Sequence, residues 1–292
     1  MNKVRSPLPW AQTHLVRYSD LSPLSLAAWS QSRTIYRSIP GGVLVPVEYG
    51  SSPPSEILIP LDSRVGGTLA HVRAEGISTV GPLPRPVARR LAQAPGVSFT
   101  VAFEHFDYVI DTRLASRLEG PRYAQLRRQR RVFEQRHPDL AASATVVDIE
   151  DVATRRSVMR FAESDIESKP YSPAEVAALA RLLALRKCYD DLVLVVVRDQ
   201  WRLLAFSLVG VEMRTWATAH FWKASRSHSE LFRFLLWKTC TVLDEAGVRY
   251  MNIEQDLGIE RLRAAKISYR PRLLLRKYWA HLTDRVVQVP TA

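Results

Sequence analysis

Three neighbouring stretches in the second half of the chain are almost continuously apolar and rich in β-branched residues. They are residues 192–198, 201–211 and 215–223. Short apolar runs of this kind, separated by polar turns, predict three consecutive strands. Residues 229–246 instead repeat their apolar positions with a helical period and stop at Gly247, a residue type that commonly ends helices. The pattern therefore predicts three strands in succession, followed by a long amphipathic helix.

Shorter patterns of the same two kinds continue on both sides. Upstream, they predict a strand at 145–149 and helices at 152–163 and 172–185; downstream, a strand at 250–255, a helix from residue 259 and a last strand around 273–282. The first third, rich in Pro and Gly, predicts helices at 25–33 and 86–93 and strands at 42–49, 56–61 and 97–110. The chain is therefore expected to be a mixed α/β (α+β) protein, with the order β-α-α-β-β-β-α-β-α-β from residue 145.

The strand at 250–255 has an unusual distribution of polar residues. Because side chains alternate across a strand, Tyr250, Asn252 and Glu254 share one face. Strands buried on both faces are usually apolar throughout. The polar face therefore predicts that this side opens into a wet cleft. The alternative is an edge strand with a solvated helix behind it.

Acidic and basic side chains follow directly after that strand. Asp256 and Gly258 predict a turn, and the next helix carries Arg263 and Lys266. Carboxylates at a strand end, beside cations on the following helix, are a candidate chemical centre. The structural alternative is that Lys266 pairs with Glu260 or Asp256.

The composition limits the class of protein. A net charge of +12 favours a polyanionic partner such as nucleic acid or an anionic membrane surface, although many basic enzymes bind neither. Cys188 and Cys240 form no disulfide framework and no metal-binding spacing, which indicates a reducing cytosol. No signal peptide is evident, and the longest apolar run, residues 192–197, is too short to span a bilayer. We expect a cytoplasmic protein without a metal or another cofactor.

Half of the net charge lies in one short segment. Residues 113–137 contain eight arginines against Glu119 and Glu134, a net charge of +6. Pro121 and Pro138 predict the ends of a helix within this segment. A solvated basic face is one interpretation; the other is a helix that contacts phosphates, because the guanidinium fork matches phosphate oxygens. The candidate contacts are Tyr123, Arg127, Arg128, Arg130 and Arg131.

The order of elements from residue 145 is that of a GNAT acyltransferase domain, and two passages carry a closer resemblance. The first is FDYVID at 106–111 with LEGPRYAQLRR at 118–128; the second is YMNIE at 250–254, then Asp256, Gly258, LRAAK at 262–266 and YRP at 269–271. In this order and separation they resemble the C-terminal domain of lysylphosphatidylglycerol synthases. The resemblance covers nearly the whole chain from about residue 24.

The resemblance implies a fold and a reaction. The fold is two tandem GNAT-like acyltransferase domains, here 1–120 and 139–292, joined by the basic helix at 121–138. Family members transfer an amino acid from aminoacyl-tRNA to an amine or hydroxyl. Membrane members carry a transmembrane portion before this domain and use phosphatidylglycerol, whereas soluble relatives act on small molecules or peptides in antibiotic pathways. Because this chain has no such portion, the soluble type is expected, with phosphatidylglycerol as the alternative acceptor.

The junction between the third strand of the apolar group and the next helix bears on the donor. In this fold an acyl-CoA enzyme holds pyrophosphate there on a glycine-containing loop. Residues 221–230 read FWKASRSHSE and contain no glycine, so close backbone approach to pyrophosphate is difficult. Two alternatives to an aminoacyl-tRNA transferase stay open. They are an acyl-CoA N-acyltransferase and a non-catalytic RNA-binding module that keeps the transferase fold.

An activated ester donor needs positioning, a proton acceptor and oxyanion stabilisation. We assign the oxyanion or terminal phosphate to Lys266 and Arg263, and the donor α-ammonium or the proton to Glu254 or Asp256. The expected substrate-binding residues are Tyr250, Asn252, His220, Trp222 and Tyr269. A lone histidine in a strand is more often structural, and Trp222 and Trp237 are more often core residues.

Three departures from the family pattern bear on the donor amino acid more than on the reaction. Glu254-Gln255-Asp256 stands where the family often has Gly-Glu-Asp. Arg122 stands where the lysyltransferases usually have Lys, and Gln129 where they often have Asn. The number of carboxylates after the strand is kept, but one glycine is lost.

Overall fold

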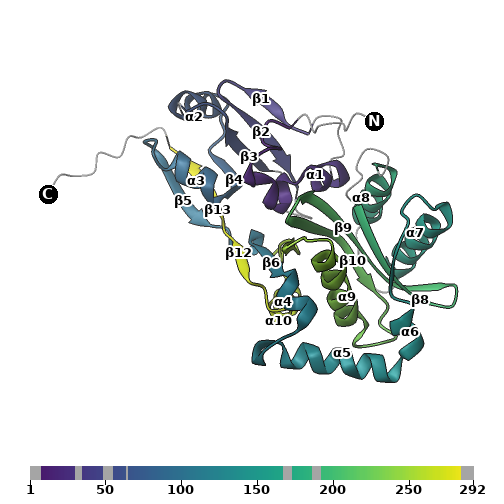
Figure 1. Ribbon diagram of the computed structural model, residues 1–292. Helices are drawn as coiled ribbons and strands as arrows, with labels where there is room; N and C mark the ends of the chain where they lie inside the picture. The colour runs from purple at the N-terminus through teal and green to yellow at the C-terminus, as the bar shows by residue number, and fades with distance from the viewer. Residues whose placement is uncertain are drawn as a thin grey trace. The chain divides into compact units, whose positions relative to one another are not determined.

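The computed structural model describes residues 8–29, 35–48, 55–63, 65–166, 173–185 and 192–283, and has a mixed α/β fold (Figure 1). Contacts divide the chain into two compact units that are interleaved in sequence. The first unit takes its residues from segments 1–30, 108–254 and 264–273; the second from 31–107, 255–263 and 274–292. Each unit is described by itself.

A seven-stranded sheet is the centre of the first unit, in the order β12-β6-β11-β10-β9-β8-β7 (Figure 1). The strands are β6 (Asp107–Asp111), β7 (Thr145–Val147), β8 (Leu192–Asp199), β9 (Arg202–Met213), β10 (Trp216–Ala224), β11 (Tyr250–Asn252) and β12 (Leu273–Leu275). β10 and β11 are parallel, whereas β7 to β10 pair antiparallel in succession and β6 is antiparallel to β11. The three consecutive strands predicted between residues 192 and 223 are therefore confirmed.

Helices cover both faces of this sheet. They are α1 (Pro23–Trp29), α4 (Thr112–Arg117), α5 (Ala124–Arg136), α6 (Pro138–Ala142), α7 (Val152–Ile166), α8 (Pro173–Ala184) and α9 (Leu231–Glu245). Leu194 and Val196 of β8 pack with α1, α7 and α8, whereas Val195 and Val197 pack with α5, α6 and α9. Because both faces are buried, the strand is apolar at consecutive positions. This burial explains the uninterrupted apolar runs of the sequence.

The second unit contains two three-stranded antiparallel sheets, in the orders β1-β2-β3 and β4-β13-β5. Its elements are β1 (Arg37–Ile39), β2 (Gly42–Val47), β3 (Ser55–Pro60), α2 (Val65–Ala74), β4 (Thr79–Pro84), α3 (Arg85–Leu91), β5 (Val97–Val101) and β13 (Lys277–Leu282). An ion pair joins Lys277 Nζ to Asp107 Oδ1 at 2.8 Å, with both side chains fully buried. The strands predicted at 42–49 and 56–61 correspond to β2 and β3.

Residues 97–110 do not form the single strand that the sequence predicts. A 3₁₀ turn at Phe103–His105 separates β5, which pairs with β13, from β6, which pairs with β11. The predicted strand at 273–282 is likewise divided into β12 and β13. These predictions were wrong because a continuous apolar pattern does not show that its two halves pair with different, distant strands. β1, α2 and β4 were not predicted, and Gly66 and Gly67 lower the helix propensity of α2.

The compact units do not follow the predicted domains 1–120, 121–138 and 139–292. The pairing of Asp111 with Tyr250 places β6 in the sheet that also contains β7 to β11. The difference arises because the expected domains were consecutive in sequence, whereas β6 and β11 pair across a long sequence separation. The predicted tandem boundaries therefore stay a prediction.

Local features of the helices complete the description. Asp111 is the N-cap of α4, since its side chain accepts a hydrogen bond from Leu114 N at 3.1 Å. The predicted helix at 25–33 is α1 as far as Trp29, while residues 30–34, Ser172 and Cys188 lie outside the described residues. Among the helices of the described segments, none combines the length and apolar character needed to cross a bilayer.

Candidate active site

β11 lies inside the sheet, between β10 and β6, so the alternative of an edge strand is wrong. Asn252 is completely buried. Its Nδ2 donates to the carbonyl oxygen of Arg17 at 2.8 Å, and its Oδ1 accepts from Glu254 N at 2.7 Å. The face that was expected to be wet is therefore closed at Asn252. It becomes accessible at Glu254, whose side chain is 25% exposed.

The backbone of Glu254 is in the left-handed region, with φ 60. This conformation costs a residue with a Cβ about 1–2 kcal/mol. The carbonyl oxygen of Glu254 accepts from Tyr108 N at 3.2 Å and from Lys266 Nζ at 3.3 Å, and its N–H is held by Asn252. Backbone strain that surrounding contacts maintain is concentrated at functional sites. Glycine would adopt this conformation without such a cost.

Lys266 is buried in α10 (Glu260–Ser268). Its Nζ donates to the carbonyl oxygens of Ile253 and Glu254, the two residues that follow β11. A buried ammonium requires such partners because its desolvation is costly. The fold therefore fixes a positive charge at the end of β11, against the backbone of Glu254.

Asp256 and Arg263 form a second charged pair, which belongs to the second compact unit. Arg263 Nε and Nη2 donate to Oδ2 and Oδ1 of Asp256 at 2.9 and 3.0 Å, a bidentate arrangement. Gly258 N donates to Oδ1 at 2.9 Å, and Gly258 has φ 75, so the predicted turn is present. Asp256 is fully buried, whereas the Arg263 side chain is 42% exposed. The four predicted catalytic residues are thus two pairs, one in each unit.

His220 occupies a bulge of β10, because the register with β9 shifts by one residue at this position. The imidazole is fully buried. Its Nδ1 lies 3.2 Å from Ser25 Oγ and 3.9 Å from Glu254 Oε1. Its Nε2 lies 3.7 Å from Glu212 Oε1 and makes no hydrogen bond within the described residues. His220 and Glu254, both predicted site residues, are therefore neighbours.

Four residues around His220 were missed by sequence reasoning. Glu212 of β9 is 3% exposed and accepts hydrogen bonds from Ser22 Oγ and from Thr218 Oγ1, the latter at 2.7 Å. Gly210 leaves room for the ring, since a Cβ there would lie 2.8 Å from His220 Nε2. Ser22 and Ser25 lie far away in sequence and carry no local signal. For Glu212 the sequence did contain a signal, because this acidic residue directly follows the apolar run at 201–211.

Burial changes the protonation of two predicted residues. Desolvation lowers the pKa of His220 from its ordinary 6.5 to about 3, so the imidazole is neutral at physiological pH. Desolvation also raises the pKa of Tyr269 to about 12, so its phenol keeps its proton. His220 is therefore available as a hydrogen-bond acceptor, and Tyr269 as a neutral aromatic group.

The predicted aromatic residues divide into two groups. Trp222 and Tyr269 stack around Phe232, with ring centroids 5.0 and 5.8 Å from it, as part of a hydrophobic cluster. This packing agrees with the core interpretation of Trp222. Tyr250 instead packs against Trp216, with centroids 5.7 Å apart. The recorded contacts of Tyr250 therefore do not bring it to Glu254.

The arginines of the basic helix differ in environment. Arg127 donates to the carbonyl oxygens of Leu118 and Gly120, and Arg130 pairs with Glu134 at 3.0 Å and lies over the Trp237 ring. Tyr123 is buried. By contrast, Arg128 and Arg131 are exposed. Of the predicted RNA contacts, these two are the ones that face solvent.

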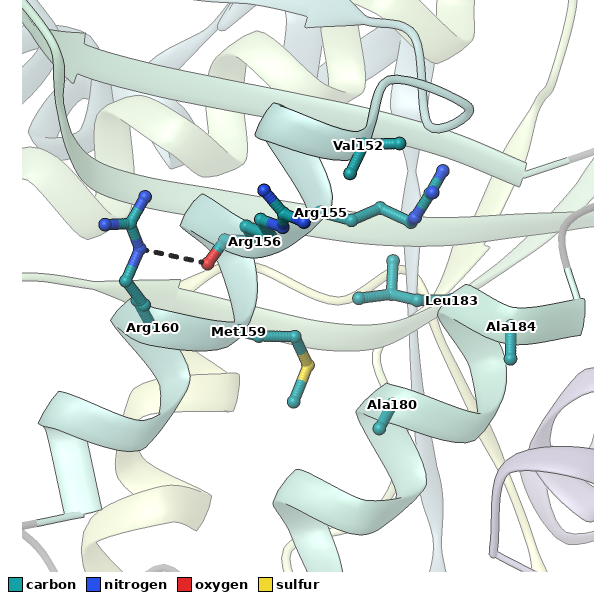
Figure 2. A pocket seen from close by; sticks show the side chains of 8 residues that line it. All are labelled: Val152, Arg155, Arg156, Met159, Arg160, Ala180, Leu183 and Ala184. Carbon is teal, nitrogen blue, oxygen red and sulfur yellow. Dashed lines mark hydrogen bonds between the residues drawn. The ribbon is translucent and has the colours of Figure 1, made fainter.

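A hollow of about 660 Å³ lies between α7 and α8. Figure 2 shows the side chains that line it. Its lining is Val152, Arg155, Arg156, Met159, Arg160, Ala180, Leu183 and Ala184. Arg155 donates to the carbonyl oxygens of Ile149 and Glu150. Because the lining combines apolar side chains with three arginines and has no acid, it suits an anionic, partly apolar ligand better than acid–base chemistry.

No cluster of three or more His, Cys, Asp or Glu in the described part of the chain is arranged to hold a metal ion. Cys240 is buried in α9, and burial raises the pKa of its thiol, so it is not a thiolate nucleophile at neutral pH.

Similar structures share this fold over most of the chain. A conserved protein of unknown function from Bacteroides thetaiotaomicron has a TM-score of 0.75 at 21% identity, covering 91% of this chain and 92% of its own. The C-terminal domain of a putative lysylphosphatidylglycerol synthetase from Agrobacterium fabrum has a TM-score of 0.62 at 15% identity, covering 91% and 87%. L-PGS from Bacillus licheniformis also has 0.62, at 13% identity, covering 90% and 88%.

The search of curated proteins gives no match. The family model described as "Phosphatidylglycerol lysyltransferase, C-terminal" matches residues 71–281, which is most of the chain. That segment includes His220, Glu254 and Lys266, together with both passages that carry the resemblance in sequence. The chain therefore belongs to the phosphatidylglycerol lysyltransferase C-terminal family.

Proposed function

We propose that the protein is an aminoacyltransferase that moves an amino acid from aminoacyl-tRNA to an amine or hydroxyl of a small molecule or peptide. Its place in the family supports the transfer reaction. A role in the biosynthesis of a specialised metabolite such as an antibiotic, in the cytoplasm, is part of the same proposal. The observation that carries it is the structure of the β10–α9 junction, which bears on the donor.

That junction disfavours a pyrophosphate group. It has no glycine between Phe221 and Glu230, and Glu230 itself is the residue before α9. The hydrogen bond from Ser229 lowers the pKa of the Glu230 carboxyl, so a negative charge occupies the start of the helix. A helix N-terminus attracts anions, and a carboxylate already present there repels a second anion. This argues for a donor that does not use the pyrophosphate loop of acyl-CoA enzymes.

A tRNA donor fits the charge of the chain. The net charge is +12, and Arg128 and Arg131 of α5 are exposed. Phosphate contacts of this kind provide affinity without reading sequence. We propose that these two residues contact tRNA phosphates, while Arg127, Arg130 and Tyr123 shape the helix that presents them.

The chemistry proposed for the site uses its fixed charges. The Lys266 ammonium, held at the end of β11, stabilises the oxyanion of the tetrahedral intermediate or the terminal phosphate. The partly exposed Glu254 takes the proton of the attacking amine or hydroxyl. The side chain of Asn252 orients Glu254 by accepting a hydrogen bond from the backbone N–H of Glu254. The roles expected for Asp256 and Arg263, which form a bidentate pair within the second unit, stay predictions.

One observation favours a second acceptor, phosphatidylglycerol. The hollow between α7 and α8 (Figure 2) presents Arg156 and Arg160 beside Met159 and Leu183. An anionic lipid combines a phosphate with apolar chains, and this lining complements both. In this second candidate function the same donor and carboxylate serve a lipid hydroxyl.

A transfer assay tests both candidates. The purified protein is incubated with each aminoacyl-tRNA, carrying a labelled amino acid, and either a set of small amines and peptides or phosphatidylglycerol vesicles. We expect one or a few aminoacyl-tRNAs to be consumed only with a matching acceptor, and RNase to abolish the product. Product formed from acyl-CoA after RNase treatment would contradict the proposed donor. Salt-dependent RNA binding without any loss of charged tRNA would instead indicate a non-catalytic RNA-binding module.

A further inference from the structure

A buried polar cluster lies behind Glu254. It consists of His220, Glu212 and Ser25. We propose that this cluster is a proton-holding relay, in which the proton taken up by Glu254 is hydrogen-bonded to Nδ1 of His220 while Glu212 faces Nε2. The inference rests on the proposed aminoacyl transfer and names the positioning residues of its carboxylate.

The contacts of the ring indicate which nitrogen carries hydrogen. A carboxylate can only accept hydrogen bonds. Because Nε2 faces Glu212 Oε1 at 3.7 Å, we assign the hydrogen to Nε2. Nδ1 then has a lone pair, and Ser25 Oγ donates to it at 3.2 Å. When the Ser25 hydroxyl turns away, a protonated Glu254 can donate to this lone pair in its place.

The distance between Glu254 and the ring suits a contact that closes during the reaction. Oε1 lies 3.9 Å from Nδ1, about 1 Å beyond a hydrogen bond. Hydrogen bonds of catalytic groups are often long before the substrate binds. Among the recorded contacts of this cluster, Glu254 is the acid that also reaches solvent, so it connects the ring with a bound acceptor.

Charges on both sides of the ring favour this use. The titratable groups recorded against it in the described segments are Glu212 from β9 and Glu254 after β11, while α1 contributes only the hydroxyl of Ser25. Burial lowers the pKa of His220 to about 3 and keeps the ring neutral before reaction. Once Glu254 has taken up the proton, the negative charge of Glu212 beside Nε2 makes Nδ1 a better hydrogen-bond acceptor and opposes the effect of burial.

The step balances without another reactant. The acceptor's N–H or O–H bond breaks, its electron pair attacks the ester carbonyl carbon, and the proton passes to Glu254 Oε1. The proton stays in the hydrogen bond to His220 Nδ1 while the tetrahedral intermediate exists. When the ester C–O bond breaks, the proton passes to the leaving ribose oxygen, which restores the carboxylate and the neutral ring.

The surrounding fold is built to hold this arrangement. Ser22 and Thr218 donate to the two carboxylate oxygens of Glu212. Gly210 supplies the space for the ring, since any Cβ would meet Nε2 at 2.8 Å. The bulge in β10 gives His220 its direction. Such support is expected where a group must be held in one orientation.

Two substitutions of His220 test the relay kinetically. His220→Phe keeps a ring and removes both nitrogens, whereas His220→Gln keeps a hydrogen-bond acceptor. We expect His220→Phe to lower kcat at least about tenfold with KM for aminoacyl-tRNA unchanged, and to move the acid limb of the pH–rate profile to lower pH. His220→Gln should restore part of both. A folded His220→Phe protein with the normal kcat and pH profile would overturn the proposal.

A measurement on the folded protein separates this inference from the proposed reaction. Nitrogen NMR of ¹⁵N-histidine protein, with His220 assigned from the His220→Gln spectrum, should show a neutral Nε2–H ring near neutral pH. Glu254→Gln should change the Nδ1 shift, whereas the exposed Glu245→Gln should not. A ring with hydrogen on Nδ1, or one indifferent to Glu254→Gln, contradicts the relay. If this coupling is present but no aminoacyl-tRNA is used, the proposed donor fails and the relay stands.

Discussion

Two stretches of this chain are basic in sequence but lie in different environments. Residues 259–271 contain Lys266 and Arg263, and both bind groups of the chain itself: backbone carbonyls after β11 and the Asp256 carboxylate. In α5 the cations alternate around the helix, so that Arg130 is held by Glu134 while Arg128 and Arg131 face solvent. Sequence composition alone treats these cations as equivalent.

The difference suggests a way to tell cations that act in catalysis from cations that bind RNA. A buried, hydrogen-bonded cation is fixed in one place, and it changes the energy of whatever reacts beside it. An exposed arginine is screened by salt and contributes little to folding, but it is available to a polyanion. We therefore expect enclosed charges to control turnover and stability, and exposed charges to control the salt dependence of RNA binding.

The largest effect is expected from Lys266→Ala. It removes the ammonium from the end of β11, and the loss of an oxyanion-stabilising donor typically lowers kcat by about 10²–10³. It also leaves the carbonyl oxygens of Ile253 and Glu254 without this donor, at a cost to the free energy of unfolding of about 1–3 kcal/mol. Single-turnover transfer and urea unfolding measure the two effects.

The matched control is Arg261→Ala on the same helix, where the side chain is exposed. It removes one positive charge without touching β11, so kcat and stability should change little. Normal transfer by a folded Lys266→Ala protein would exclude Lys266 from the proposed mechanism. The contrast between this buried cation and the exposed arginines of α5 would then not concern catalysis.

The next largest effect is expected from Asp256→Asn. An amide offers one acceptor oxygen, and its NH₂ faces the guanidinium of Arg263, donor against donor. We expect the free energy of unfolding to fall by about 1–3 kcal/mol. Glu260→Gln, an exposed acid four residues further on, should change it by less than about 0.5 kcal/mol. An equal loss of unfolding free energy in the two variants would mean that the burial of Asp256 is not the reason for its contribution to stability.

The fold was predicted where local pattern determines it. β8, β9, β10 and α9 followed from apolar periodicity within each segment. The split of residues 97–110 between two sheets did not, because it depends on partners at Met251 and Ala280 that lie far along the chain. Local propensity indicates which secondary structure a segment can form, whereas strand pairing depends on which distant segment it contacts.

The candidate site shows the same limit. The contact between Lys266 and the end of β11 lies within one strand–turn–helix passage, which the sequence indicated as a candidate chemical centre without predicting this contact. The partners of His220 come from three separate segments, through Ser25, Glu212 and Glu254. No local signal brings them together. The local sequence also does not show that Gly210 is needed to leave space for the His220 ring.

A smaller effect concerns the pH dependence of stability. Burial lowers the pKa of His220 from 6.5 to about 3. Between these values the unfolded chain binds a proton that the folded chain does not. The free energy of unfolding should therefore fall as pH is lowered from 6.5 toward 3, by up to about 1.4 kcal/mol per pH unit, and this term should be flat above 6.5.

Urea unfolding of His220→Gln across that range checks the sign. The variant should lose this part of the slope, whereas His14→Gln, at an exposed histidine, should keep it. If both variants keep the full slope, the enclosed imidazole is not its source, and the carboxylates of the chain account for acid sensitivity.

The smallest effect on the fold, and the sharpest test of the comparison, is the double substitution Arg128→Gln with Arg131→Gln. Both side chains are exposed, so the free energy of unfolding should stay within about 0.5 kcal/mol. Each phosphate contact contributes about 0.9 to the slope of log K against log salt, so the slope for tRNA binding should fall by about 2. Binding measured at several salt concentrations gives that slope directly.

The control removes the same charge elsewhere. Arg85→Gln with Arg89→Gln changes two exposed arginines of α3, in the second unit. If α5 contacts the tRNA, this pair should lower the slope much less than the α5 pair. An equal fall would mean that the net charge of +12 attracts RNA from a distance and that no helix is specialised for it. The exposed arginines would then differ from the buried cations only in the strength of their electrostatic interactions.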